Sequence, residues 1–92
     1  MKIQQKDDGE TGMFFIKEND ETVAEMVYSW QGKDRIIIEH TEVGDALKGK
    51  GTGKELVAKS VEFARERSIK IIPVCSFAKR IFDKTKEFQD VL

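Results

Sequence analysis

Residues 47–54 read Leu47-Lys48-Gly49-Lys50-Gly51-Thr52-Gly53-Lys54, and this stretch joins two segments with different hydrophobic periods. Before it, the apolar run 36–38 leads into His40-Thr41-Glu42-Val43, as a strand would. After it, apolar or small residues recur at 56, 57, 60, 61 and 64, which is the spacing of one helical face. Glycines let backbone N–H groups turn toward one point, and a helix start adds partial positive charge. A strand, a glycine-rich loop and a helix start therefore predict a site for a phosphate-bearing ligand.

The rest of the chain predicts an α/β fold of the α+β kind. Short links between four strand-like segments in the first half indicate an antiparallel meander that ends with strand 35–41. A helix over 52–67 and a fifth strand over 69–74 then imply a right-handed crossover, which makes the fourth and fifth strands parallel. Pro73 has no N–H, so strand pairing should stop near it, and Ser76 should cap a last helix that runs to about 84. We expect a mostly antiparallel sheet of about five strands with one parallel pair and two main helices.

Length and charge limit the classes of function. The 92 residues fit one small domain over 1–92, and a net charge of −1 from 16 basic and 17 acidic residues argues against a nucleic-acid or membrane-surface role. The single cysteine, Cys75, cannot form an internal disulfide. No apolar run approaches the ~20 residues of a membrane helix, and the N-terminus has no signal-peptide pattern. We expect a soluble, cytoplasmic protein, most simply a monomer, without nucleic-acid or membrane partners.

Three motifs resemble a known superfamily. The stretch Lys48-Gly49-Lys50-Gly51-Thr52-Gly53 is similar to the signature Q/R-x-x-G-x-G/A of the GNAT superfamily of acyl-CoA N-acyltransferases, and it lies between a strand and the main helix as it does there. The strand end His40-Thr41-Glu42-Val43, the loop 47–53 and the strand end Pro73-Val74-Cys75 resemble a group of very small GNAT-like proteins. The resemblance covers about residues 36–92.

This resemblance implies an acetyl-CoA-dependent N-acetyltransferase that acts on an amine, either a small molecule or a peptide, without a metal. Loop 48–53 would hold the CoA pyrophosphate, and backbone groups of Thr41 to Val43 would meet the pantetheine arm in a slot between the fourth and fifth strands. The acetyl group would then lie near Glu42 and Cys75. The implied cofactor-binding residues are Thr41, Val43, Lys48, Gly49, Lys50, Gly51, Thr52, Gly53, Lys54 and Phe77, the last of which packs against the pantetheine or seals the core.

Three residues are candidates for proton or acyl transfer. Glu42 and His40 lie two apart in a strand, so both point to one face, and either is a candidate base for the acceptor ammonium, Glu42 being the first choice. Cys75 precedes a helix, where the pKa of a thiol can fall. It is therefore a candidate nucleophile or acid, unless it is a small core residue.

Two other functions remain open. Many GNAT enzymes use a tyrosine on the last helix as general acid, but the only tyrosine here is Tyr28. A CoA or acyl-CoA binding module without catalysis is therefore the first alternative. Residues 44–50 also fit G-x-x-x-x-G-K, yet Gly51 stands where a P-loop needs Ser or Thr, which makes a nucleotide-binding protein the weaker alternative.

Overall fold

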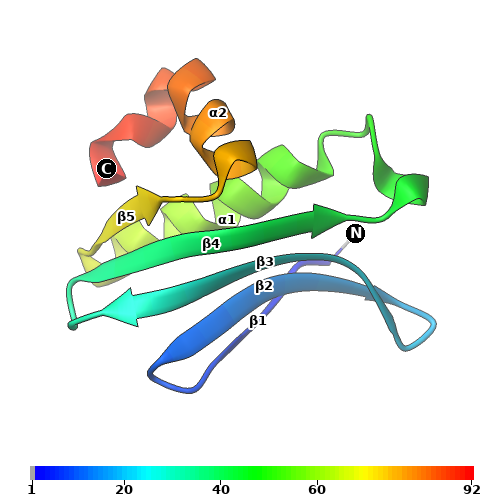
Figure 1. Ribbon diagram of the computed structural model, residues 1–92, viewed down its shortest axis with the longest axis horizontal. Helices are drawn as coiled ribbons and strands as arrows, with labels where there is room; N and C mark the ends of the chain where they lie inside the picture. The colour runs from blue at the N-terminus through cyan, green and yellow to red at the C-terminus, as the bar shows by residue number, and fades with distance from the viewer. Residues whose placement is uncertain (1) are drawn as a thin grey trace.

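The computed structural model describes residues 2–92 and contains one five-stranded sheet (Figure 1). The strand order is β1-β2-β3-β4-β5, with antiparallel neighbours except for the parallel pair β4 and β5. The strands are β1 (Gln4–Asp7), β2 (Thr11–Glu18), β3 (Glu21–Gln31), β4 (Arg35–Val43) and β5 (Lys70–Pro73). The helices are α1 (Thr52–Arg67) and α2 (Ser76–Lys84), with short 3₁₀ helices η1 (Asp45–Leu47) and η2 (Lys86–Val91). The predicted fold class, with one parallel pair and two main helices, is confirmed.

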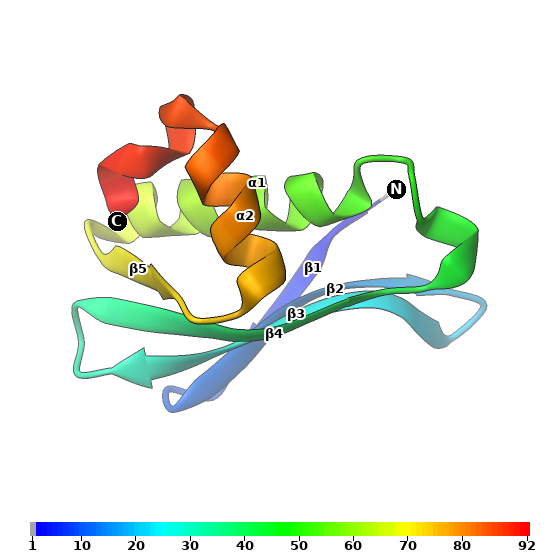
Figure 2. The ribbon, with the colours of Figure 1, turned by 45° about the horizontal axis from the view of Figure 1, so that its top comes forward.

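Both main helices lie on the same face of the sheet (Figure 2). Apolar side chains from β2, β3, β4 and β5 meet the apolar stripe of α1 there, and this burial supplies the main stabilisation of the fold. Within residues 2–92, no helix covers the opposite face, which we call the outer face. None of the helices described is long and apolar enough to cross a membrane. The largest fully buried apolar side chains are Tyr28, Phe82, Ile16, Met26, Ile36, Ile38, Leu56, Ile71, Val57 and Val61.

A β-bulge in β4 decides which side chains reach the helix side of the sheet. Val27 pairs with His40, but the next residue of β3 pairs with Ile38, so Glu39 has no partner of its own. An extra residue in one strand shifts the in-and-out alternation beyond it. As a result Ile38 is fully buried, whereas His40, which would otherwise follow it into the core, is exposed. Beyond the bulge the helix side receives Thr41 and Val43 instead.

β4 loses its β5 partner halfway along its length. The parallel pairing runs from Arg35 opposite Lys70 to Ile38 opposite Pro73, as the prediction for Pro73 required. The amides of Val74 and Cys75 then both donate to the Ile38 carbonyl, at 3.1 and 2.9 Å, and the chain turns away into α2. The remainder of β4 is left with a free edge beside the helices, in accord with the expected separation of the two strands.

The boundaries of α1 match the predicted 52–67, whereas the expected cap of α2 is wrong. Ser76 is the first residue of α2, and Cys75 is the N-cap in an extended conformation. The reason lies in the backbone, because the amide of Lys79 donates to the Cys75 carbonyl at 2.9 Å and closes the first helical turn one residue earlier than expected. No side chain caps this helix end. Cys75 thus sits directly at the start of a helix.

A hydrogen-bonded group around Asp7 ties the first hairpin to β3. The Asp7 carboxylate accepts hydrogen bonds from the Tyr28 hydroxyl at 2.6 Å, the Trp30 indole at 2.8 Å and the Gly9 amide at 2.7 Å. Gln5 donates to the Tyr28 hydroxyl at 2.8 Å, which leaves that buried oxygen satisfied. Partial burial would raise the pKa of Asp7, but these three donors outweigh it and hold the pKa below its usual value.

Replacing Asp7 with alanine is expected to lower the free energy of unfolding by about 1–2 kcal/mol at neutral pH, because a buried hydroxyl and an indole N–H lose their acceptor. The pKa of Asp7 is lower in the folded than in the unfolded state, so charged Asp7 stabilises the fold. This stabilisation is complete above the unfolded-state pKa of about 3.9 and is lost as the pH falls through the folded-state pKa. Urea unfolding of both proteins at several pH values measures the difference. A difference that stays constant down to strongly acidic pH would contradict this assignment.

Candidate functional site

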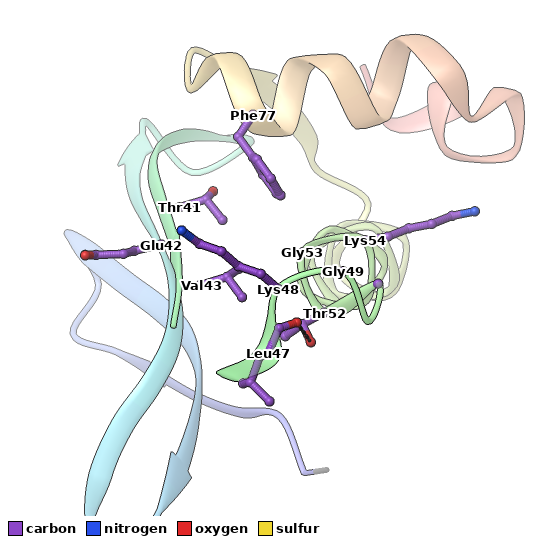
Figure 3. A pocket seen from close by; sticks show the side chains of 11 residues that line it. Thr41, Glu42, Val43, Leu47, Lys48, Gly49, Thr52, Gly53, Lys54 and Phe77 are labelled. Atoms are coloured by element: carbon purple, nitrogen blue, oxygen red, sulfur yellow. Dashed lines mark hydrogen bonds between the residues drawn. The ribbon is translucent and has the colours of Figure 1, made fainter. Parts of the chain in front are cut away.

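A cavity of about 440 Å³ opens where β4 leaves β5 (Figure 3). Its walls come from the end of β4, the loop after η1, the first turn of α1 and the start of α2. It therefore forms at the place predicted from the glycine-rich stretch. The lining residues are Thr41, Glu42, Val43, Leu47, Lys48, Gly49, Gly51, Thr52, Gly53, Lys54 and Phe77.

The loop presents a group of unpaired backbone amides to this cavity. Gly49 and Gly51 have φ of +79° and +76°, a left-handed conformation that glycine adopts without strain. A Cβ added to either residue would meet no atom within 4 Å, so both face open space. Between residues 2 and 92, no protein group accepts a hydrogen bond from the amides of Gly49, Gly51, Thr52, Gly53 or Lys54. Amides of this kind at a helix N-terminus are suited to bind a phosphate oxygen.

Gly53 and Phe77 bring α1 and α2 into close contact at the cavity. A Cβ on Gly53 would lie 2.3 Å from the Phe77 ring, so only glycine allows the ring to pack on the first turn of α1. Phe77 is 40% exposed and forms an apolar wall opposite Val43. The cavity thus combines an apolar slot with a polar end at the glycines.

Three lysines were expected around the glycines, and the structure separates their positions. Lys48 and Lys54 line the cavity, whereas Lys50 is exposed outside it. Lys48 Nζ lies 3.0 Å from the Asp45 carboxylate, but this ion pair is exposed and such pairs contribute little free energy. Lys48 can therefore exchange Asp45 for an anionic ligand at small cost.

The candidate bases lie on the other face of the sheet. Because of the bulge, Thr41 and Val43 point into the cavity, while the side chain of Glu42 points away from it (Figure 3). His40 Nε2 lies 3.3 Å from Glu42 Oε2 on the outer face, where their side chains are 55% and 71% exposed. The expectation that these two residues share a face is thus met, but the carboxylate of Glu42 does not face the slot in which the acetyl group was expected to lie.

Glu25 joins His40 and Glu42, and the sequence alone did not single it out. It lies directly opposite Glu42 in the β3–β4 pairing. Ligand atoms of the three side chains lie within 4.8 Å of one another, which is a donor set that a divalent cation accepts. No local pattern marks Glu25 as a site residue, because its pairing with Glu42 depends on the strand register.

Cys75 lies on the helix side of the sheet and contacts Thr41 rather than His40. The Cys75 thiol donates to the Thr41 hydroxyl at 3.5 Å, whereas His40 lies beside Glu42 on the outer face, so Cys75 and His40 do not pair. Partial burial alone would raise the pKa of Cys75. When Cys75 is a thiolate it accepts hydrogen bonds from the Thr41 hydroxyl and from the amides of Ala78, Phe77 and Thr41, and together these outweigh burial and lower the pKa below its usual value.

Replacing Thr41 with valine is expected to raise the pKa of Cys75, because valine has the same shape but no hydroxyl to stabilise the thiolate. The measurement is the rate of alkylation by iodoacetamide as a function of pH, since the thiolate is the reactive form. The half-maximal rate should move to higher pH in the variant than in the wild type. Identical profiles for wild type and variant would show that Thr41 does not stabilise the thiolate.

Comparisons with known proteins agree on one family. The model of a family described as GCN5-related N-acetyl-transferase matches residues 13–91. The NMR structure of a GCN5-like candidate N-acetyltransferase from Staphylococcus aureus has 40% sequence identity and a TM-score of 0.78, and the match covers 98% of this chain and 85% of that chain.

Two further similarities are more limited. Protein NATD1 of Xenopus tropicalis is 32% identical over 57 residues, which are 62% of this chain and 52% of NATD1, so the chain spans about half the length of that relative. The crystal structure of a predicted acetyltransferase with acetyl-CoA from Clostridium acetobutylicum has a TM-score of 0.65 at 18% identity, over 80% of this chain and 55% of that chain. The latter supports the fold alone.

Proposed function

Because the chain belongs to the GCN5-related N-acetyltransferase family, as the match over residues 13–91 shows, we propose that it binds acetyl-CoA and transfers the acetyl group to an amine. The observation that carries the proposal is the cavity between the free edge of β4 and the unpaired amides of Gly49 and of Gly51 to Lys54. A phosphate-binding end joined to an apolar slot fits the two halves of this ligand.

The fit rests on residues of two chemical kinds. The amides of Gly49 and Gly51 to Lys54 suit the pyrophosphate, with Lys48 supplying positive charge beside it. The side chain of Lys54 extends away from the cavity (Figure 3), so its charge acts over a longer distance. Thr41, Val43 and Phe77 line the slot that suits the pantetheine arm. Lys50 lies outside the cavity lining, so its charge would act on the phosphates only over a longer distance.

Acetyl-CoA would supply an activated acetyl thioester at the end of this slot. The acceptor must reach the reaction as a neutral amine, and Glu42 on the outer face is our first choice for the base that removes the ammonium proton, with His40 beside it as the alternate. This assigns the acceptor to the outer face and the cofactor to the helix side, with the free edge of β4 between them. A backbone amide near Val43 is our candidate for oxyanion stabilisation.

Cys75 has two possible roles that one measurement separates. With a lowered pKa it can give its proton to the departing CoA thiolate, or its own thiolate can carry the acetyl group before the amine takes it. Intact-protein mass spectrometry after mixing with acetyl-CoA alone distinguishes the two. A stable acetyl adduct that is absent in the Cys75→Ala variant indicates the carrier role.

A CoA or acyl-CoA binding module without catalysis is the second candidate function. It is favoured by the position of Tyr28, the single tyrosine of the sequence, which is fully buried and hydrogen-bonded to Asp7 and does not lie on α2. Wild-type protein that binds acetyl-CoA but acetylates no member of a broad amine and peptide panel would favour this module. The P-loop alternative has no support in the family match, and Gly51 still stands where it needs a hydroxyl.

The first test is a titration of the labelled protein with acetyl-CoA, followed by amide NMR shifts, with ATP and magnesium as the parallel control. We expect acetyl-CoA alone to move the amides of Val43, Gly49, Gly51, Gly53 and Cys75. If neither ligand perturbs the glycine loop, or only ATP with magnesium does, the proposal of acetyl-CoA binding is wrong.

A further inference from the structure

The slot ends where the side chains of Thr41 and Cys75 meet across the gap between β4 and β5. The Cys75 thiol donates to the Thr41 hydroxyl at 3.5 Å. Thr41 is among the residues that line the cavity, whereas Cys75 and the residues of β5 are not. Thr41 and Val43 both point into the cavity, and strand geometry places Thr41 roughly 6–7 Å farther from the glycine loop. The contact between Thr41 and Cys75 therefore forms the inner end of the slot.

Backbone closes the slot behind this contact. The amides of Val74 and Cys75 both donate to the carbonyl of Ile38, which is fully buried. These hydrogen bonds join β4 to the start of α2, so a change of side-chain rotamer cannot deepen the slot at this point. At the side, the Phe77 ring already packs on Gly53, where a Cβ would lie 2.3 Å from it. The ring therefore cannot move toward α1 to make room, and the inner end of the slot has a fixed size.

We infer that Thr41, with Cys75 behind it, limits the length of the acyl group that the protein accepts, and that the limit excludes chains longer than acetyl by several carbons. This inference rests on the proposed function, because phosphates at the glycine loop direct the acyl end of the ligand to the inner end of the slot. The acetyl methyl group then contacts the Thr41 side chain. A longer chain must displace Thr41 or Cys75, and packed side chains resist added methylene groups.

The test compares the Kd values of acetyl-CoA and butyryl-CoA by isothermal titration calorimetry. We expect butyryl-CoA to bind the wild-type protein more weakly than acetyl-CoA by about 10-fold or more, because a pocket of fixed size discriminates at least that much for an added methylene group. Thr41→Ala should bring the ratio of the two Kd values toward one, because it removes the side-chain atoms at the inner end of the slot. The ratio is taken within each variant, so a general loss of affinity cancels from it.

Two control variants separate the size of the slot end from other effects. Val43→Ala removes a side chain of the same shape from the same side of β4, but nearer to the glycine loop, so the ratio should stay at its wild-type value. Thr41→Val keeps the size of the side chain and removes only the hydroxyl that contacts Cys75, so the ratio should also stay unchanged. Urea unfolding of each variant shows whether the fold persists.

The outcomes separate this inference from the proposed function. If acetyl-CoA binds and butyryl-CoA binds equally well or better, the inference is wrong and the proposed binding of acetyl-CoA stands. The inference is also wrong if the ratio of Kd values does not fall in Thr41→Ala, or if it falls as far in Val43→Ala or Thr41→Val. If neither acyl-CoA binds the wild-type protein, the proposed function fails and this inference fails with it.

Discussion

Replacing Gly51 with valine is expected to weaken acetyl-CoA binding by at least about 10-fold, equal to ~1.4 kcal/mol, with the fold intact. Gly51 has φ of +76°, which a β-branched residue adopts only with strain, so the loop must shift the amides it presents. Its added side chain would also enter the open space in front of α1, where the phosphates are proposed to bind. Isothermal titration calorimetry measures the affinity, and urea unfolding shows whether the fold persists.

The matched control is Gly9→Val in the turn between β1 and β2. Gly9 also has positive φ, +91°, and a Cβ there also meets no atom within 4 Å, but it lies outside the cavity lining. Backbone strain is therefore similar in the two variants. Equal losses of acetyl-CoA affinity in both would mean that the effect is global, and an undiminished affinity in Gly51→Val would remove the glycine loop from the proposed site.

Replacing Glu42 with glutamine is expected to lower kcat by about 100-fold or more, because general base catalysis typically contributes that much. Glutamine keeps the shape of the side chain and its place at the end of β4 but cannot take up the ammonium proton. Acetyl-CoA affinity should not change, since the side chain points away from the cofactor cavity. Steady-state release of CoA thiol, with an amine that the wild-type protein acetylates, measures the rate, and calorimetry measures the binding.

Glu39→Gln is the control for Glu42→Gln. Glu39 is a neighbouring exposed carboxylate at the bulge of β4, and it accepts a hydrogen bond from Ser29 at 3.0 Å. The Glu39→Gln substitution changes the local charge by the same amount as Glu42→Gln without removing the proposed base. A wild-type rate in Glu42→Gln would assign the role of general base to His40 or to water. Equal losses of rate in both variants would show that the combined negative charge of these carboxylates matters rather than one base.

Local patterns were sufficient where neighbouring residues alone decide the structure. The period of three and four along 52–67 gave the bounds of α1, because a helix forms its hydrogen bonds within itself. Glycines at 49, 51 and 53 predicted a loop suited to phosphate before α1, because backbone φ angles and helix polarity are also local properties. Pro73 predicted the end of β5, because it lacks an amide to donate.

Tertiary structure decided the features that depend on partners distant in the sequence. The bulge at Glu39 arises in the pairing of β4 with β3, and it alone puts Thr41 beside Cys75 and turns Glu42 to the outer face. The sequence placed His40 and Glu42 on a common face, but no local pattern says which face a strand presents once an extra residue enters it.

The same limit applies to the pair of Glu25 and Glu42 and to the group around Asp7. Glu25 meets Glu42 through strand register, and Asp7 meets Tyr28 across 21 positions of the chain. The sequence by itself therefore determined the elements, their order and the glycine-rich loop before α1. Only the folded sheet decided which carboxylates meet and on which face of the sheet they lie, because strand pairing is a long-range interaction and helix and loop conformation are short-range ones.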